Sequence, residues 1–149
     1  MQHMDEPYVA SLMERLRAIP EDATPRWGSM TRDQLIRHLI WLVRHSMDRS
    51  KAVPFMGNWF TVRVLAPLMV RGWLPMPKNL KMPALMLRAS QQEQGDLETL
   101  HALLEDYLAQ VQEGSLAPAA HPIFGDIGVD GWEQVHLRHF EHHLRQFGV

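Results

Sequence analysis

Apolar residues recur every three or four positions in several long stretches of the chain, which is the spacing of a helix that buries one face. The first stretch runs from about Glu6 to Ala18 and carries Val9, Leu12, Met13 and Leu16 on one side. Pro20 and Pro25 mark the end of this helix and the loop after it, because proline cannot continue a helix. We therefore predict an amphipathic helix over residues 6–18.

The second helix carries a start signal. In the run Thr31-Arg-Asp-Gln34 the threonine hydroxyl can accept from the third helical amide while the Gln34 side chain reaches back, which is a capping box. Leu35, Leu39 and Leu42 continue the apolar stripe, so we predict a helix from Thr31 to about Met47.

Two further helices are predicted in the second half of the chain. One runs from about Gly95 to Glu113, and Gly114 is its expected stop. The last begins at Asp130, which we expect to cap it with Glu133 at the matching box position, and ends at Gly148.

The stretch from Lys51 to Arg88 contains prolines at 54, 67, 75, 77 and 83 and has no long helical pattern. We predict one helical piece near Trp59 to Val70 and otherwise an irregular excursion that covers one end of the molecule. Long irregular connections of this kind often act as lids or pocket walls. Trp27 and Trp41 are candidates for the same wall.

The predicted fold is all-α, because four amphipathic helices are present and no alternating stretch is long enough for a sheet. An up-and-down four-helix bundle, formed by residues 1–149 as a single domain, is the simplest arrangement of these elements.

The composition of 46% hydrophobic and 21% charged residues is that of a soluble globular protein, and the formal net charge is −2. With no basic surplus, we expect neither nucleic acid nor a membrane as partner. The N-terminus lacks the apolar region of a secretory signal, and Arg63, Pro67 and Arg71 interrupt the most apolar stretch, so we expect a cytoplasmic protein. The absence of cysteine excludes disulfides, thiolate zinc sites and a cysteine nucleophile.

Histidines concentrate in the last predicted helix. His139 and His143 are one turn apart on one face, about 40° from each other at 100° per residue. His136 lies on the same side and His142 on its flank, and this side also carries the apolar residues. Buried imidazoles need partners for their ring nitrogens, and a metal ion supplies one such partner. The pair is therefore a candidate metal site.

A third ligand has to come from another helix. His38 and His45 both lie on the inner face of the second helix, but they are two turns apart, about 10 Å along the axis, so they cannot share one ion. Spacing alone does not choose between them.

Four motifs resemble one family. The run from Pro25 to Leu39, the loop Pro75-Met-Pro-Lys78, the segment His121-Pro-Ile-Phe-Gly125 and the closing run His139-Phe-Glu-His-His143-Leu-Arg-Gln-Phe-Gly148 are similar to the DinB/YfiT-like superfamily of metalloenzymes. Within that superfamily they resemble the domain-of-unknown-function group numbered 1569. The likeness spans nearly the whole chain.

The resemblance implies a DinB/YfiT-like four-helix bundle that holds one divalent metal ion, zinc or nickel first, on His38, His139 and His143. It implies a mononuclear metal-dependent enzyme of hydrolase or thiol-dependent transferase type, whose substrate is a small molecule that can carry a thiol. His142 is then a candidate for proton transfer or for support of the ligand pair, and His136 is a second candidate base. Exposed Trp59 and Trp73 would favour a homodimer.

Two alternatives stand beside this reading. The same three histidines can staple the helices in a non-catalytic, metal-stabilised binding or structural module. A di-iron site on the Glu-x-x-His runs at Glu98 and Glu133 is disfavoured, because Glu98 falls on the polar face of its helix and the second helix offers no glutamate.

Overall fold

In this computed structural model, which describes residues 2–51 and 53–149, three of the four long helices begin at side chains that cap them. Asp5 accepts from the backbone of Tyr8 at the start of α1 (Glu6–Arg17). Thr31 and Gln34 form the predicted capping box of α2 (Arg32–Ser46). Asp96 caps α5 (Leu97–Glu113), which begins two residues after the predicted start at about Gly95.

The fourth long helix, α6 (Gly128–Phe147), begins earlier than predicted. Asp130 lies inside its first turn and does not cap it, and Asp126 accepts from the backbone of Gly128 instead. Glu133 makes no box, because its carboxylate accepts from the backbone of Met4 at 2.8 Å. The predicted stop at Gly148 is confirmed, with a left-handed φ of 79°.

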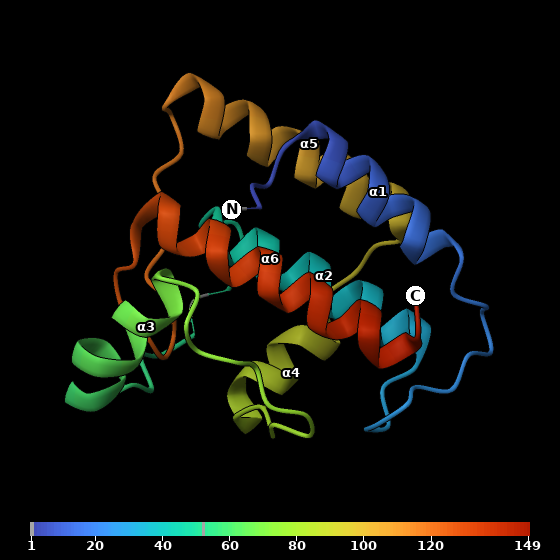
Figure 1. The fold of residues 1–149 in the computed structure, drawn as a ribbon, viewed down its shortest axis with the longest axis horizontal. Coiled ribbons are helices and arrows are strands. Elements are labelled where there is room, and N and C mark those ends of the chain that lie inside the picture. The colour runs from blue at the N-terminus through green and yellow to red at the C-terminus, as the bar shows by residue number, and fades with distance from the viewer. Residues whose placement is uncertain (1, 52) are drawn as a thin grey trace.

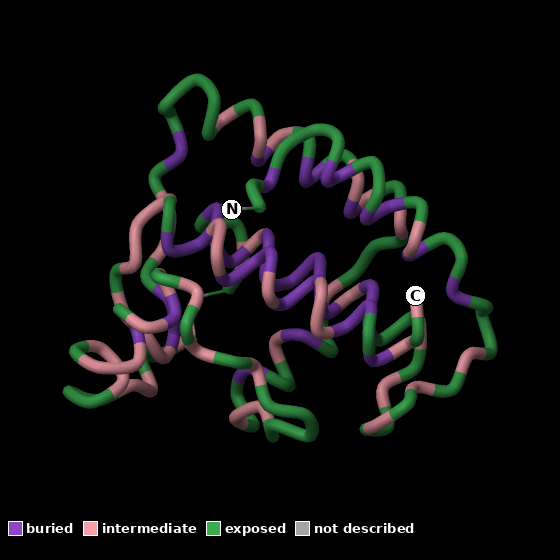
Figure 2. The backbone as a smooth tube through the Cα atoms, viewed as in Figure 1, coloured by how far each residue is buried: buried purple, intermediate pink, exposed green. Residues whose placement is uncertain are grey.

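The four long helices lie together (Figure 1) and share one apolar cluster, while a second apolar cluster joins α2 and α6 to the excursion. α5 packs on α1 and α2, and α6 packs on the same two helices. Buried positions follow the inner sides of these helices, whereas most of the excursion is intermediate or exposed (Figure 2). The fully buried residues include Leu12, Met13, Leu35, Leu39, Leu100, Leu104 and Leu144. The all-helical class is confirmed, since the described residues form helices and no strand, apart from an isolated bridge between His121 and Gly125.

The excursion is more helical than predicted. The expected piece near residues 59–70 is present as η1 (Thr61–Leu65), wound as a π-helix, and α3 (Ala66–Val70). The prediction of irregular chain was wrong for α4 (Ala84–Gln92), a nine-residue helix. Pro83 precedes its first residue, where a proline costs no hydrogen bond, so this proline starts a helix and does not break one.

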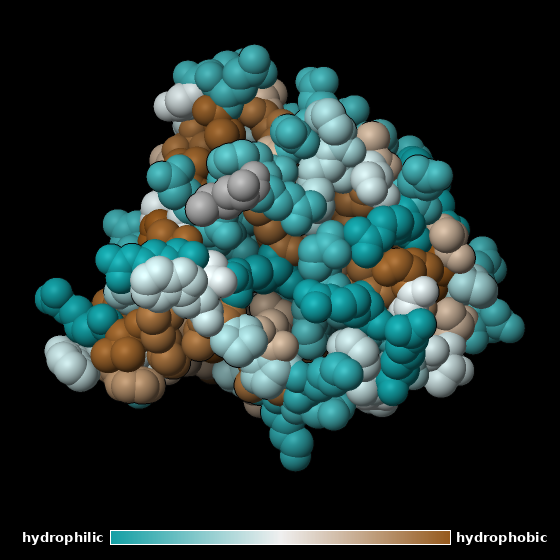
Figure 3. Space-filling model, in the orientation of Figure 1, coloured by the Kyte–Doolittle hydropathy of each residue, from teal (hydrophilic) through white to brown (hydrophobic). Residues whose placement is uncertain are grey.

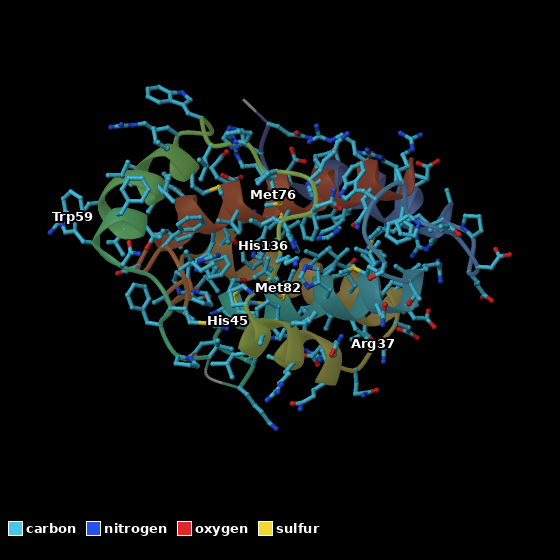
Figure 4. All side chains as sticks on the ribbon, turned by 90° about the horizontal axis from the view of Figure 1, so that it is seen from below. Arg37, His45, Trp59, Met76, Met82 and His136 are labelled. Carbon is cyan, nitrogen blue, oxygen red and sulfur yellow. The ribbon has the colours of Figure 1, made fainter. Side chains whose placement is uncertain are left out.

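The excursion bridges α6 and α2. The guanidinium of Arg138 on α6 donates to the carbonyl oxygens of Gly72 and Leu74. At the other end α4 packs on α2, and Ser90 of α4 lies 3.0 Å from a ring nitrogen of His38. In the view from below, Met76 and Met82 of the intervening loop lie between α6 and α4 (Figure 4). The excursion therefore crosses the side of the molecule where α2 and α6 meet.

One surface near α3 is apolar (Figure 3). Trp59 and Trp73 are 73% and 68% exposed, as expected from the sequence. The homodimer that their exposure would favour stays a prediction. None of the described helices has the length and apolarity needed to cross a bilayer.

Candidate metal centre

Three histidine nitrogens converge where α2 packs against α6. The Nε2 atom of His139 lies 2.8 Å from Nε2 of His38 and 3.1 Å from Nε2 of His143. All three ligand atoms lie within 4.8 Å of one another, and the three side chains are buried. Two ligands come from successive turns of α6 and one from the middle of α2, so the site exists only where the helices pack. His38, His139 and His143 can together hold a metal ion.

The proton on His143 is fixed by its neighbour. Nδ1 of His143 lies 2.6 Å from Oε1 of Gln146, and Nε2 of Gln146 donates to the carbonyl oxygen of Trp27 at 3.0 Å. Because that carbonyl can only accept, the amide oxygen of Gln146 faces the imidazole, and Nδ1 of His143 must donate to it. Nε2 of His143 therefore presents a lone pair to the centre of the site.

Ser90 is the hydrogen-bond partner of His38, through a hydroxyl that can either donate or accept. Its hydroxyl lies 3.0 Å from Nδ1 of His38, and a donating Nδ1 leaves the Nε2 lone pair free to bind a cation. The ring of Trp41 stacks on the other side of His38 at a centroid distance of 6.2 Å. A helix absent from the sequence prediction thus supplies the group that orients the α2 ligand.

His139 shows that the donor set fits a cation. Its Nδ1 is buried and has no hydrogen-bond partner among the described residues, and its Nε2 faces two other nitrogens. In the absence of a cation one proton on His139 has to serve both neighbours. In tetrahedral zinc sites the bound nitrogens are roughly 3.3 Å apart, close to the spacing found here. Three neutral imidazoles around one divalent ion satisfy all three inner lone pairs.

Burial keeps these histidines neutral. Desolvation holds the pKa of His38 and of His139 well below the usual range, and neighbouring histidines lower both further. Burial also lowers the pKa of His143 to about 4, against a smaller rise from Gln146. Metals bind the neutral imidazole, so the ligands are in the required protonation state at neutral pH.

The structure decides between His38 and His45. Nε2 of His45 lies 3.2 Å from the carbonyl oxygen of Ala120, and its Nδ1 lies 3.3 Å from the hydroxyl of Ser50. His45 packs between Trp41 and Trp132 and takes no part in the cluster. The alternative that spacing had left open is therefore wrong for this site.

His136 is a core residue. It is completely buried, its Nε2 lies 2.9 Å from the hydroxyl of Ser46, and its ring stacks between Trp132 and Phe140. Desolvation lowers its pKa to about 3. Because its side chain has no access to solvent, His136 is not placed to act as a base at the cluster.

His142 stands at the edge of the site. It is half-buried, its ring meets the ring of His143 at 5.2 Å, and it contacts Trp27 edge-on at 5.5 Å. Desolvation and the charge of Arg145 lower its pKa. No described residue hydrogen-bonds to its ring nitrogens, which leaves them available to a ligand.

The glutamates of the di-iron alternative point elsewhere. Glu98 pairs with Arg17 at 3.0 Å on an exposed surface, and Glu133 binds the backbone of Met4. Neither carboxylate is part of the histidine cluster, which agrees with the sequence argument against a di-iron site.

Sequence reasoning missed the two residues that orient the ligands, Ser90 and Gln146. Gln146 had a local signal, because it follows His143 by three positions and so lies on the same helix face. Ser90 had none, since its contact with His38 spans 52 positions of the chain.

Comparison with known proteins gives one match. Residues 8–148 match the model of the family described as "Protein of unknown function (DUF1569)". No curated protein and no solved structure in the comparison is similar to the chain. The match extends over both histidine-bearing helices and the excursion between α2 and α5. This chain therefore belongs to the DUF1569 family.

Proposed function

We propose that this protein is a mononuclear metalloenzyme of the DinB/YfiT type, an up-and-down four-helix bundle with one divalent ion on His38, His139 and His143. The observation that supports it is the convergence of three Nε2 atoms from two helices, two of them with Nδ1 hydrogen-bonded to an oxygen. Three protein ligands leave a coordination position open, as in catalytic rather than structural zinc sites.

When bound, a divalent ion at this position supplies Lewis-acid chemistry, which polarises a carbonyl or activates a thiol or water. This chemistry serves a hydrolase or a thiol-dependent transferase acting on a small molecule. The surrounding residues have separate tasks. Ser90 and Gln146 hold two ligand rings in orientation, and the excursion limits access of water to the histidine cluster.

His142 is the proposed proton acceptor. Its ring is half-buried beside His143, and its nitrogens are unused by the described residues. A substrate held at the three-histidine cluster would lie next to this ring. A general base has to be within hydrogen-bond reach of the proton that it takes, and among the candidates His142 is the one that lies at the edge of the cluster.

Elemental analysis of protein purified without an affinity tag tests the metal site. We expect about one equivalent of zinc, nickel or a similar ion per chain, and its loss in His139→Ala, which removes the central nitrogen. His45→Gln is the matched control, because His45 is also a buried histidine, on α2, but lies outside the cluster. Equal metal content in both variants would contradict the site.

Turnover separates an enzyme from a metal-stabilised module. The metal-loaded and metal-free proteins, with the His142→Gln variant, are assayed on esters and on thiol adducts. Metal-dependent turnover that falls on the His142 substitution, with metal content unchanged, supports the proposal. A metal that raises the melting temperature but gives no turnover on either substrate class favours the non-catalytic alternative.

A further inference from the structure

Charge is segregated along this chain. From Lys51 to Gln92 the sequence contains no aspartate or glutamate, although the whole protein has more acidic than basic residues. The segment carries six cationic residues, all exposed: Lys51, Arg63, Arg71, Lys78, Lys81 and Arg88. None of the six forms a salt bridge with any described residue, whereas arginines of α1 and α2 do. The charged residues of the excursion that connects α6 and α2 are therefore all cationic.

One of these cations lies beside the candidate metal centre. The Lys78 ammonium group lies 4.8 Å from the ring centroid of Trp27, which contacts His142 at 5.5 Å, and His142 in turn contacts His143 at 5.2 Å. Lys78 is exposed, so its ammonium group is open to a ligand on the side away from the indole. Successive contacts between neighbouring side chains thus connect the exposed Lys78 to the histidine cluster.

Two of the polar atoms without partners near the centre are indole nitrogens, which are donors. The indole nitrogens of Trp27 and Trp41 are buried and make no hydrogen bond with the described residues. Trp27 lies beside His142, and Trp41 beside His38. An indole N–H can only donate, and a buried donor without a partner costs about 1–3 kcal/mol. Each of these N–H groups can bind only a group that accepts a hydrogen bond.

Among the residues that the structure describes, the histidine cluster includes no carboxylate. The groups whose charges act on the pKa of His38, His139, His142 and His143 are other histidines and Arg145. Three neutral ligands leave a divalent ion with its full charge. The ion, Lys78 and the two indole donors together form a region that favours negative charge.

From this arrangement we infer that the substrate is a small organic anion whose carboxylate binds Lys78 and Trp27, while its reacting end lies at the three-histidine cluster. This inference rests on the proposed function and specifies the class of substrate. The cationic excursion attracts the anion to this side of the molecule, and the indole and ammonium donors hold its charged group away from the reacting atoms.

Binding of dicarboxylates to the cobalt-loaded protein tests the inference, with the visible spectrum of the ion as the readout. Succinate and glutarate are compared with their monoamides, which keep one carboxylate for the metal and lose the remote charge. We expect at least one diacid to bind about fivefold more tightly than its monoamide, the size of an exposed ion pair. Because exposed charges are screened, this preference should shrink as salt is added.

Three variants locate the preference. Lys78→Gln should reduce the ratio of the two affinities to about one, and Lys78→Glu should invert it. Trp27→Phe keeps an aromatic face for Lys78 but removes the N–H, so the ratio should fall partway. Arg63→Gln is the control, because Arg63 is an exposed cation of the same acid-free segment on η1, which packs on α3.

The two levels of the proposal fail separately. If the unmodified protein did not bind cobalt, or showed no visible spectrum of bound cobalt, the metal site would be overturned. Normal cobalt binding with no preference for either diacid would overturn the anionic substrate and leave the metal site intact. A preference that survives Lys78→Gln, or that Arg63→Gln abolishes equally, would also overturn it.

Discussion

At the residue scale, the chemistry of the centre depends on the second nitrogen of each ligand ring. Gln146 accepts from Nδ1 of His143 because its own amide nitrogen is committed to the carbonyl of Trp27. The loop before α2 is thereby tied to the ligand helix through one side chain. Such outer partners fix the tautomer and the ring orientation of a ligand.

Gln146→Leu should therefore weaken metal binding about 10–100-fold, because His143 loses the acceptor that orients it. Gln146→Glu keeps an acceptor at the same position and should retain most of the affinity. Competition with a chromophoric chelator measures both. Equal affinities for the leucine and glutamate variants would show that the contact does not support the ligand.

At the element scale, the excursion is held at its two ends by different helices. Arg138 of α6 binds two of its carbonyls, and α4 packs on α2 with Ser90 against His38. The position of the loop between these anchors depends on them, and opening of such a segment can occur without unfolding the core.

Arg138→Ala should release the loop. The lost hydrogen bonds are worth about 1–3 kcal/mol, so trypsin should cleave after Lys78 or Lys81 on the order of tenfold faster. Arg145→Ala is the control, because Arg145 lies on the same helix but bonds only to the carbonyl of Glu141. Mass spectrometry of the fragments identifies the tryptic cleavage sites. Unchanged cleavage in Arg138→Ala would place the anchor elsewhere.

At the scale of the whole molecule, the helices bury several neutral histidines. Desolvation lowers the pKa of His121 and of His136 to about 3, against 6.5 in the unfolded chain. Between these values the unfolded state binds more protons than the folded state, so the free energy of unfolding increases with pH in this window. The stabilisation is complete above about pH 6.5 and is lost as the pH falls towards 3.

The metal-free protein should therefore lose stability on acidification, by up to about 1.4 kcal/mol per pH unit for each buried histidine. His136→Leu should lower this slope by about that amount between roughly pH 6 and pH 5. Urea unfolding of both proteins at each pH measures it. The same slope in His136→Leu and in a His101→Gln control on α5 would contradict the assignment.

The sequence alone determined the features that depend on near neighbours in the chain. The capping box at Thr31, the stops at Gly114 and Gly148 and the pairing of His139 with His143 involve residues no more than about one helical turn apart. The periodicity of apolar residues also determined the all-helical class. These signals are local because helix geometry repeats every 3.6 residues.

Local signals failed where another element decided the outcome. Glu133 reads as a box residue, but the N-terminal segment presents its backbone amide to it, and Asp130 lies inside the helix that it was expected to cap. Pro83 reads as a helix breaker, but it starts α4, whose Met86 and Ser90 are buried. A proline can end a helix or start one, and a cap residue can lie before a helix or inside it. Packing against other elements decides which of these occurs.

The site itself was decided by tertiary structure. Spacing showed that His38 and His45 could not both be ligands, and the resemblance pointed to His38, but only the packing of α2 on α6 brings one of them to His139. Ser90 reaches His38 across 52 positions of sequence. Contacts of this kind follow from the burial of apolar faces by helices far apart in the chain, and that burial is a property of the folded molecule.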